Sequence, residues 1–527
     1  MFSNTKNLKV KFISLEGGIY VFGFRKIASI ARKIHPDTKI YFVPTSNYYS
    51  ITSFLLPSKN STFSNLDATA VAKQVSDADL ICFSSMTPSA PCVEKIAKII
   101  KQINPKAFLL WGGIHCIIYP DQAIKHVDAI CIGEGEKSFE IFFQAFSQKQ
   151  NFKNTPSMWF KTKSKIKKNK ILPLCTSEEL NSFPHPYIGL DCQIYNISKK
   201  SFYQFTYKDY IKYNGLTYRV MWTVGCPFSC TYCGNESFVR LDPHYRQIRY
   251  PSSEYMISEI EAGLKMYPFV NSISFFDDNF IAVPIKTMKE LFKKYKKRVN
   301  LPHYIQGIHP NLVTQEKIEL IGQSGANRMR MGIQSGSEKI LAFYQRPTSI
   351  KNIKKGANIL IKTSLKYKMI CPSFDIISDN PLEKKEDIIQ TLNLLYSFKR
   401  PYTLTLFSLR VFPNTPLADY FNNNPDIDIS YQKSSYLETR KTLTNIAFYV
   451  LATFKPPKFI FNWIIANIKD YDKDQESSKI IYFIAKFSFL SSRALRHLIK
   501  TDFSIMAGSW VYYLWRLRLI KKNSSAL

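Results

Sequence analysis

Short apolar runs alternate with amphipathic segments along the first 150 residues. Five short, largely apolar runs predict strands, at Val10–Ser14, Ile40–Val43, Leu80–Ser84, Ala107–Trp111 and Ala129–Ile132. Between them, apolar residues recur at three- and four-residue spacing, which predicts helices at Ile27–Ile34, Ala68–Val75 and Val93–Ile103. Strands that alternate with helices build a parallel, doubly wound sheet, so residues 1–150 are predicted to form a Rossmann-like α/β domain.

The same alternation returns in residues 219–420. Six runs predict strands, at Val220–Val224, Ser272–Phe276, His303–Ile308, Arg328–Ile333, Met369–Ile377 and Tyr402–Leu409. Six strand–helix repeats predict a partial (β/α)6 barrel with its site at the carboxyl ends of the strands. The intervening residues 151–218 hold a basic stretch and the turn-rich Phe183-Pro184-His185-Pro186, so we expect a linker there.

Residues 421–527 have a different pattern, because their apolar segments are longer and more aromatic. They predict a helical region, with segments at Asn445–Phe454, Phe459–Ile468, Ile480–Phe489 and Phe503–Ile520. Lys455-Pro456-Pro457-Lys458 divides the first two segments, and neither reaches the roughly 20 residues that cross a bilayer. Aromatic and basic helices of this kind fit two roles, a peripheral contact with a membrane surface or a cap on the barrel.

Composition and charge narrow the class of protein. The 527 residues include 31 Tyr and 39 Phe, which exclude wholesale disorder. The formal net charge of +32 attracts anions, but its lysines are scattered, as in Lys161–Lys170, which favours a solvated basic surface over nucleic-acid binding. Ten cysteines in a chain of this length are no disulfide scaffold. The first residues, Met1–Ser14, show no signal peptide, so we expect a cytoplasmic protein, with membrane association as the alternative.

One tight cysteine cluster stands out, at Cys226, Cys230 and Cys233. Thiolates are the usual ligands of iron–sulfur clusters, and intervals of three and two residues let one loop wrap a [4Fe–4S] cubane. Three ligands leave one iron open to a cofactor with an amine and a carboxylate. The alternative is a zinc site, but structural zinc sites use four ligands, and the spacing of His244 matches no such module.

The cysteine loop, with Tyr232 before its last Cys, resembles that of the radical S-adenosylmethionine (SAM) superfamily. Later segments resemble other motifs of that family. They are Phe275–Phe280, Met331–Ser335 (with Gln334 where Glu is more usual), Asp375–Glu383 and Phe412–Leu417. The resemblance implies that the three Cys hold a [4Fe–4S] cluster, and that the open iron binds S-adenosylmethionine and yields a 5′-deoxyadenosyl radical.

The resemblance also implies roles for individual residues. Tyr232 is expected near the adenine, Asp277 and Asp278 near the methionine amine or the substrate, and Gln334 and Ser335 near the ribose. The two aspartates have a second interpretation, as a cap on the end of their strand.

Small residues follow three predicted strands of the first domain. They are Ser84-Ser85, Gly112-Gly113-Ile114-His115 and Gly133-Glu134-Gly135-Glu136. In doubly wound sheets ligands bind beyond the carboxyl ends of the strands, and small residues let a ligand approach the backbone closely. Their arrangement at one sheet edge therefore predicts a ligand site.

This domain resembles the cobalamin-binding domain that precedes the radical domain in one subclass of the superfamily. The resemblance implies a cobalamin pocket that includes Ser84, Ser85, Gly112, Gly113, His115, Gly133, Glu134 and Gly135, although a structural role explains His115 equally well. Many cobalamin domains carry a cobalt-ligating His after the first strand. Here that place reads Glu16-Gly17-Gly18-Ile19-Tyr20, so we predict no histidine ligand from this loop.

The resemblance implies an enzyme that uses cobalamin and the radical for methyl transfer to, or cyclisation or rearrangement of, an unactivated carbon. We expect a small-molecule or lipid-like substrate and a reducing partner such as flavodoxin or ferredoxin. One alternative is a tRNA methylthiotransferase-like enzyme, but Cys82, Cys92 and Cys116 lack the motifs of its extra cluster. The other is a degenerate, non-catalytic membrane-surface protein, against which the intact cysteine triplet argues.

Overall fold

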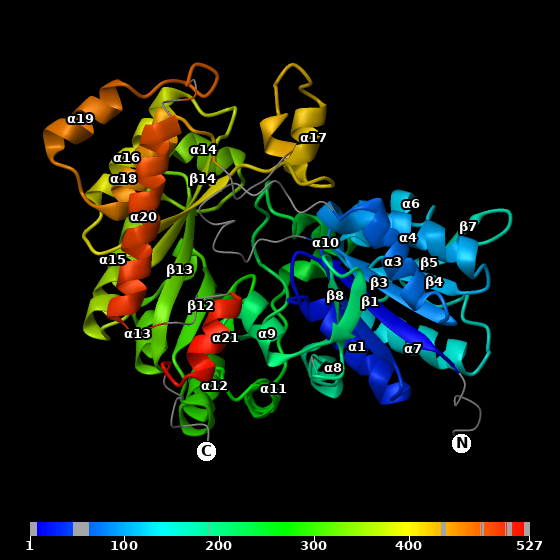
Figure 1. The fold of residues 1–527 in the computed structure, drawn as a ribbon. Coiled ribbons are helices and arrows are strands. Elements are labelled where there is room, and N and C mark those ends of the chain that lie inside the picture. The colour runs from blue at the N-terminus through cyan, green and yellow to red at the C-terminus, as the bar shows by residue number, and fades with distance from the viewer. Residues whose placement is uncertain are drawn as a thin grey trace. The chain divides into compact units, whose positions relative to one another are not determined.

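The structure is a computed structural model that describes residues 8–45, 63–187, 189–433, 439–474, 476, 479–500, 502 and 508–520 (Figure 1). Two compact units divide the chain. One comprises residues 1–218, 258–270 and 504–523, and the other comprises residues 219–257, 271–503 and 524–527. Each unit is organised around one sheet.

The first unit contains the predicted doubly wound sheet. Its central strands are β1 (Val10–Glu16), β2 (Lys39–Pro44), β3 (Leu80–Ser85), β4 (Phe108–Gly112) and β5 (Ala129–Cys131), in the order β5-β4-β3-β1-β2. All four pairings between them are parallel. The strand order reverses between β1 and β3, and such a switch point is where doubly wound sheets bind their ligands.

Helices connect these strands and supply the apolar side chains that cover them. They are α1 (Phe22–Ile34), α3 (Asn65–Val75), α4 (Ala90–Ile103), the short α5 (Ile114–Ile118) and α6 (Pro120–Ala123), and α7 (Gly135–Ser147). Ile13 of β1, Trp111 of β4 and Val93 of α4 are fully buried in one core. Burial of such a side chain stabilises the fold by about 1.5–3 kcal/mol, so alternating strands and amphipathic helices are sufficient to specify this layer.

The expected linker at residues 151–218 is wrong, because this segment contributes four strands to the same sheet. They are β6 (Met158–Lys161), β7 (Ile166–Lys168), β8 (Gln193–Asn196) and β9 (Ser201–Gln204). β6 and β7 extend one edge through antiparallel pairs, while β8 pairs parallel with β2 and antiparallel with β9. These strands have only three or four residues each, and the edge strand β7 carries two lysines, which discourage further pairing, so the segment has the polar appearance of a loop.

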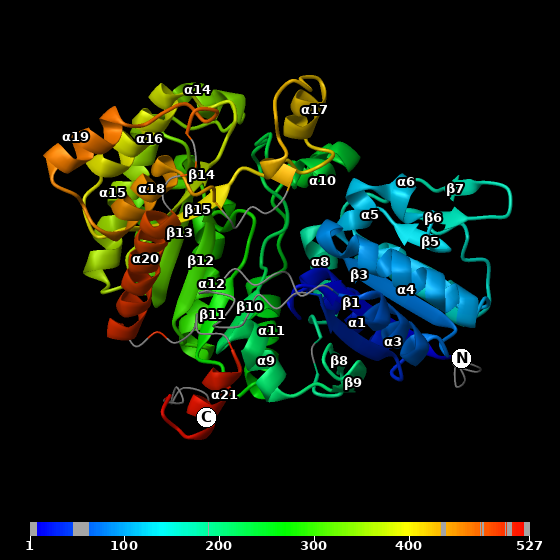
Figure 2. The same cartoon turned by 45° about the horizontal axis from the view of Figure 1, so that its top comes forward.

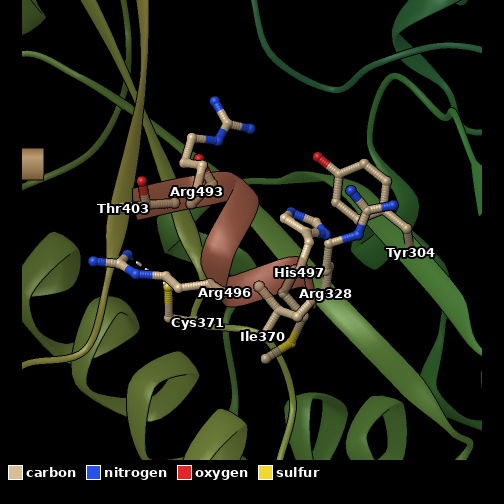
Figure 3. Close-up of a pocket in the computed structure, with 10 residues that line it drawn as sticks. Tyr304, Arg328, Ile370, Cys371, Thr403, Arg493, Arg496 and His497 are labelled. Carbon is tan, nitrogen blue, oxygen red and sulfur yellow. Dashed lines mark hydrogen bonds between the residues drawn. The ribbon is translucent and has the colours of Figure 1, made fainter. Parts of the chain in front are cut away.

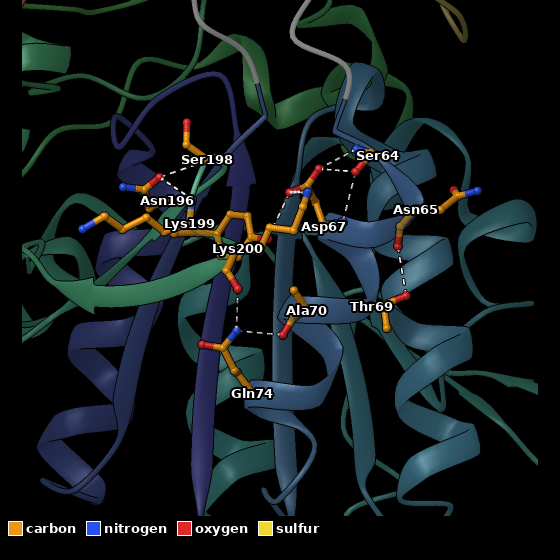
Figure 4. A network of polar contacts seen from close by, with 11 residues as sticks. Ser64, Asn65, Asp67, Thr69, Ala70, Gln74, Asn196, Ser198, Lys199 and Lys200 are labelled. Carbon is orange, nitrogen blue, oxygen red and sulfur yellow. Dashed lines mark hydrogen bonds and ion pairs between the residues drawn. The ribbon is translucent and has the colours of Figure 1, made fainter.

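Buried polar contacts attach β8 and β9 to α3 (Figure 4). Ser64 caps α3, and the Asp67 carboxylate accepts hydrogen bonds from the Tyr195 hydroxyl at 3.0 Å and from Lys200 Nζ at 3.3 Å. The Gln74 side chain bonds the backbone of both Lys200 and Phe202. Burial would raise the pKa of Asp67, but its bonds from Ser64, Tyr195 and Lys200 lower it overall. The ionised carboxylate thus fixes this hairpin on α3.

The remaining helices of the first unit are α8 (Ser177–Ser182), α9 (Tyr207–Asn214) and α21 (Ser509–Arg516). Trp515 of α21 packs edge-on against Tyr207 and Phe269, and the Tyr513 hydroxyl accepts a hydrogen bond from Lys208 at 2.9 Å. The last helix of the chain is therefore part of the first unit.

The second unit contains the predicted partial barrel. Its six strands lie in sequence order, as β10 (Thr217–Val220), β11 (Ser272–Phe275), β12 (His303–Ile308), β13 (Ala326–Gln334), β14 (Ser373–Ser378) and β15 (Thr403–Ser408). The pairings from β11 to β15 are parallel. The helices that connect them are α10 (Glu236–Leu241), α11 (Ser253–Met266), α12 (Ile285–Arg298), α13 (Gln315–Gln323), α14 (Glu338–Phe343), α15 (Ile350–Lys366) and α16 (Lys385–Ser397) (Figure 2). The part of α11 from residue 258 onward is counted with the first unit.

The C-terminal region is helical, as predicted. It forms α17 (Pro416–Asn422), α18 (Leu443–Thr453), α19 (Lys458–Ala466), α20 (Lys479–Ile499) and α21. Residues 503–507 of the expected helix Phe503–Ile520 lie outside the described residues. Among the helices that the structure describes, none combines the length and the apolar character that crossing a membrane requires.

Candidate functional site

The three cysteines occupy a loop after β10 that begins at a conformationally demanding glycine. Val224 pairs with Arg249 in an antiparallel bridge, and the Cys226 N–H donates to the Tyr245 carbonyl at 3.3 Å. Gly225 lies between them with φ +101°, and an added Cβ would lie 2.6 Å from the Tyr245 and Gln247 carbonyl oxygens. Only glycine tolerates both the dihedral angle and the close approach, so Gly225 fixes the direction in which Cys226 enters the loop.

The far end of the loop is held by backbone hydrogen bonds to two distant segments. The Thr231 N–H donates to the Tyr344 carbonyl at 2.9 Å, and the Thr231 carbonyl accepts from the Leu417 N–H at 3.1 Å. Within the loop, the Cys233 N–H donates to the Cys230 carbonyl at 2.9 Å. These bonds close the turn that brings the second and third cysteines together.

Arg346 provides a buried positive charge beside this loop. Its Nη1 lies 3.6 Å from the Cys230 Sγ and 3.2 Å from the Tyr232 hydroxyl, and its Nη2 donates to the Gly332 carbonyl. Burial would lower the pKa of this guanidinium, but Tyr232 and Cys230 raise it overall, so the group stays charged. A guanidinium in this position offsets part of the negative charge that three thiolates would bring.

The donor set of the loop fits an iron–sulfur cluster. Burial raises the pKa of Cys226 to about 11 and that of Cys233 to about 12, so both are neutral thiols unless a metal displaces their protons. Within the described part of the chain, no three Cys, His, Asp or Glu side chains converge as ligands of a single ion would. Each thiolate of a cubane binds a different iron, so a cluster needs no such convergence.

Asp277 and Asp278 follow β11. One Asp277 oxygen accepts the Thr223 N–H, as a strand-end cap does, while the buried Oδ2 has no hydrogen-bond partner among the described residues. Burial raises the pKa of Asp277 to about 7. Asp278 accepts from the Tyr245 hydroxyl at 3.3 Å, and its charge contributes to raising the pKa of Cys226 and Cys233. One oxygen of Asp277 thus caps the strand end. The other oxygen is an acceptor that could receive a hydrogen bond from an amine.

Gln334 and Ser335 end β13 in different environments. Gln334 has φ +76°, an unusual value for a residue with a side chain, and its amide lies over Gly332 next to Arg346. Ser335 is fully buried, with its Oγ 3.3 Å from the Thr391 hydroxyl and accepting the Ser337 N–H at 3.1 Å. Ser335 therefore organises the loop after β13, and a ribose contact for either residue stays a prediction.

His309 was missed by the sequence analysis. It follows β12, and its ring stacks on Phe228 of the cysteine loop with the ring centroids 3.7 Å apart. Burial, and then the charge of Arg346, lower the pKa of His309, so the ring is neutral. The rule that functional residues follow barrel strands would have selected it.

In the first unit, the small residues after β3 and β4 form a tight cradle. Gly113 has φ +93°, and an added Cβ would lie 3.0 Å from both the Ser84 Oγ and the Ser85 carbonyl oxygen. Next to it, the Trp111 indole N–H donates to the Ser85 hydroxyl at 3.1 Å, and the indole ring stacks on the imidazole ring of His115. His115 is buried, and neither ring nitrogen has a hydrogen-bond partner among the described residues. A polar group buried without a partner fits a missing ligand.

The residues after β5 have structural contacts. Glu134 accepts the Cys175 N–H at 2.8 Å, and an added Cβ on Gly135 would lie 3.0 Å from Ile27. An added Cβ on Gly133 would lie 3.5 Å from the Ser157 Oγ, an ordinary van der Waals distance. These positions bring the loop close to its neighbours, and their contact with cobalamin stays a prediction.

Glu16 occupies the switch point between β1 and β3. Its carboxyl accepts the Met86 N–H at 2.6 Å, and burial raises its pKa to about 8. It is the residue found where many cobalamin domains begin their histidine motif, and it links the ends of the two strands that flank the switch.

A cavity of about 30 Å³ in the second unit is unrelated to the cysteine loop (Figure 3). It lies near the starts of β12 to β15, whereas Cys226, Asp277 and Gln334 belong to the opposite, carboxyl ends of the strands. Its lining includes Tyr304, Arg328, Cys371, Thr403, Arg493, Arg496 and His497. α20 therefore closes the bottom of the barrel with basic side chains.

Comparisons with known proteins support both domains. Residues 57–143 match the B12 binding domain and residues 220–395 match the radical SAM superfamily. The chain is 23% identical over 371 residues to a protein of Pyrococcus horikoshii named as an uncharacterized methyltransferase, covering 69% of this chain and 73% of that protein. It is 22% identical over 376 residues to the anaerobic magnesium-protoporphyrin IX monomethyl ester cyclase of Cereibacter sphaeroides, covering 68% of this chain and 55% of the cyclase.

A solved structure shares the fold. The radical SAM methyltransferase TsrM of Kitasatospora setae, with cobalamin and a [4Fe–4S] cluster bound, aligns with a TM-score of 0.57 at 12% identity, over 79% of this chain and 75% of that one.

Proposed function

Because the chain belongs to the radical SAM superfamily, with a B12 binding domain ahead of its radical domain, we propose that it is a cobalamin-dependent radical enzyme. Its reaction is methyl transfer to, or cyclisation or rearrangement of, an unactivated carbon. The observation that carries this proposal is the loop of Cys226, Cys230 and Cys233, set at the carboxyl end of the first barrel strand beside the charge of Arg346.

The side chains of the loop divide the work of holding the cofactors. Cys226, Cys230 and Cys233 would bind three irons, and the fourth iron with S-adenosylmethionine supplies the radical chemistry once reduced. Arg346 keeps the neighbourhood positive, and the free oxygen of Asp277 would orient an amine. In the other domain, Gly113 and Ser84 would admit cobalamin close to the backbone, and His115 would supply a polar contact.

Two details of the reaction belong to the proposal. Relatives named as a methyltransferase and as a cyclase support both methyl transfer and cyclisation. The substrate that we propose is a small molecule or a lipid-like molecule. Each reductive cleavage of S-adenosylmethionine takes one electron, and we propose a flavodoxin or ferredoxin as the reducing partner that supplies it.

The test is anaerobic reconstitution with iron, sulfide and cobalamin, followed by iron and cobalt quantitation. With reductant and S-adenosylmethionine, the protein should release 5′-deoxyadenosine. Cys226→Ala, Cys230→Ala and Cys233→Ala should each abolish that product, whereas the control Cys92→Ala, at a partly buried cysteine of the first unit, should not. Product formation that persists in the three loop variants would refute the radical function, and iron without cobalt would refute only the cobalamin.

A further inference from the structure

Helix α20 presents an apolar face outward. Ile480, Ile484, Phe487, Leu495 and Leu498 are 72%, 63%, 57%, 57% and 48% exposed. Their spacing of four, three, eight and three residues places all five on one side of the helix. A surface helix normally presents its polar side to water, so the polarity of α20 is inverted.

The opposite side of α20 is held firmly in the second unit. Tyr482 and Phe489 pack against Tyr449 of α18, with ring centroids 5.7 Å and 5.3 Å apart. Arg496 donates to the Tyr402 carbonyl at 3.0 Å, and His497 lies 3.0 Å from the Asp502 carboxylate. Because aromatic packing and buried polar bonds both fix the rotation of the helix, the apolar side cannot turn inward without breaking them.

Helix α19 repeats the design. Phe461 stacks on Tyr396 of α16 with centroids 4.0 Å apart, while Phe459 and Trp463 are 72% and 61% exposed. Both helices lie on the outside of the second unit in Figures 1 and 2. We call the exposed apolar side chains of α19 and α20 the apolar face. Large apolar side chains that are exposed together on one side of a helix mark interaction sites.

The charge around the apolar face identifies its partner. Neither residues 442–469 nor residues 479–500 contain an Asp or Glu. Arg493 and Arg496 line the cavity of the barrel, and the remaining basic side chains are Lys455, Lys458, Lys469, Lys479, Lys486 and Lys500. The connecting loop holds four acidic residues. Asp470 accepts the Lys385 N–H and Asp474 is buried against Thr444, while Asp472 and Glu476 are exposed, so the lysines outnumber the exposed carboxylates of the loop. An apolar surface flanked by lysines suits a partner that has an apolar interior and a negatively charged surface.

We propose that the apolar face docks on an anionic lipid bilayer, with α19 and α20 lying in the plane of its surface. Ile484 and Phe487 enter the acyl boundary, and Lys479 and Lys486 stay among the headgroups, because lysine stems place their ammonium groups at the polar level. No described helix suits crossing, so the contact is peripheral. The docking does not depend on the proposed radical chemistry.

The experiment is co-sedimentation of the full chain with phosphatidylcholine vesicles and with vesicles that also contain phosphatidylglycerol. Binding should be stronger to the anionic vesicles and should weaken with salt. The double variant Phe487→Ser, Leu495→Ser should reduce it by about tenfold or more. Leu365→Ser is the matched control, since Leu365 is 56% exposed on α15, and it should bind like the parent.

Two outcomes would overturn the proposal. One is equal or absent binding to the two kinds of vesicle. The other is a dimer without lipid, measured by light scattering after gel filtration, that the same double variant dissociates; the apolar face would then join two copies of the chain. Iron content after reconstitution shows whether each variant is folded. If the protein forms no 5′-deoxyadenosine, the radical function is wrong, but the expected vesicle binding is the same.

Discussion

Arg346 places its guanidinium 3.6 Å from the Sγ of Cys230. The two residues are 116 positions apart in sequence and belong to different strand-end loops of the barrel. A permanent cation therefore stands beside the middle cysteine of the loop, where it would favour the extra electron of a reduced cluster.

Replacing Arg346 with Gln should make the bound cluster harder to reduce. The variant keeps a hydrogen-bond donor but loses the charge. The midpoint potential should therefore fall by about 60 mV, which corresponds to a tenfold change in the equilibrium constant of a one-electron couple. A redox titration followed by electron paramagnetic resonance measures this. Arg240→Gln is the control, because Arg240 is partly exposed and paired with Asp419. An unchanged potential in Arg346→Gln would mean that the guanidinium acts only on packing.

Gly225→Ala should prevent cluster assembly. The new Cβ would have to adopt φ +101° and approach two carbonyl oxygens at 2.6 Å, which costs about 1–3 kcal/mol or moves the loop. Gly234→Ala is a matched control, since nothing lies within 4 Å of a Cβ at Gly234 and its φ is not left-handed. Iron and sulfide quantitation after reconstitution should show loss in the first variant and retention in the second. Equal loss in both would assign the effect to the loop's general flexibility.

Glu16→Gln should remove a pH dependence of the first unit. Burial raises the pKa of Glu16 to about 8, above its ordinary 4.5, so the folded state holds a proton that the unfolded state releases. This stabilisation is full below the unfolded pKa and is lost as pH rises towards about 8. The amide keeps an acceptor for the Met86 N–H.

The change is measured as the difference in Tm between parent and variant at several pH values. The variant should gain a few degrees relative to the parent as pH rises from about 5 to about 8, since about 1 kcal/mol shifts Tm by roughly 2–4 °C in a domain of this size. A constant difference across that range would show that Glu16 does not titrate there.

Comparing Gly112→Ala with Gly113→Ala should distinguish an effect on cobalamin binding from an effect on the stability of the first unit. A Cβ at Gly112 meets only Cys131, at 4.0 Å, so the free protein should keep its stability within about 0.5 kcal/mol. A Cβ at Gly113 would be strained at φ +93° and crowd Ser84 and Ser85, so the free protein should lose about 1–3 kcal/mol. Denaturant unfolding and a cobalamin titration by absorbance give the two readouts. Weaker cobalamin binding in the stable Gly112→Ala variant would show that the ligand contacts this edge, and unchanged binding would remove Gly112 from the pocket.

The sequence predicted the two sheets because their strands are buried on both faces. Runs such as Leu80–Ser84 and Ser272–Phe276 are apolar except for their serines, and each is followed by a helix with a regular apolar spacing. β6 to β9 escaped because they are only three or four residues long and two of them, β7 and β9, lie at the edges of the sheet. Ile166–Lys168 has two lysines in three residues, and its partner strand could not be inferred from its own composition.

The site was predicted where chemistry and spacing coincide, and missed where it depends on distant contacts. The cysteine triplet is local, so its residues were named directly. Arg346 lies beyond α14 in sequence and reaches Cys230 only after the barrel has formed. Ser335 was assigned to a ribose by resemblance, but no sequence pattern could show that Thr391 and Ser337 already engage its hydroxyl.

Helix α21 has a practical consequence for dissecting the gene. Because α21 belongs to the unit that begins at the N-terminus, a fragment ending near residue 218 would lack Trp515, the partner of Tyr207. A fragment starting there would keep Trp515 and Phe269 but lack Tyr207. Short C-terminal deletions should then register as damage to the B12 binding half. Circular permutation, which keeps every segment, is the better route to testing how independent the halves are.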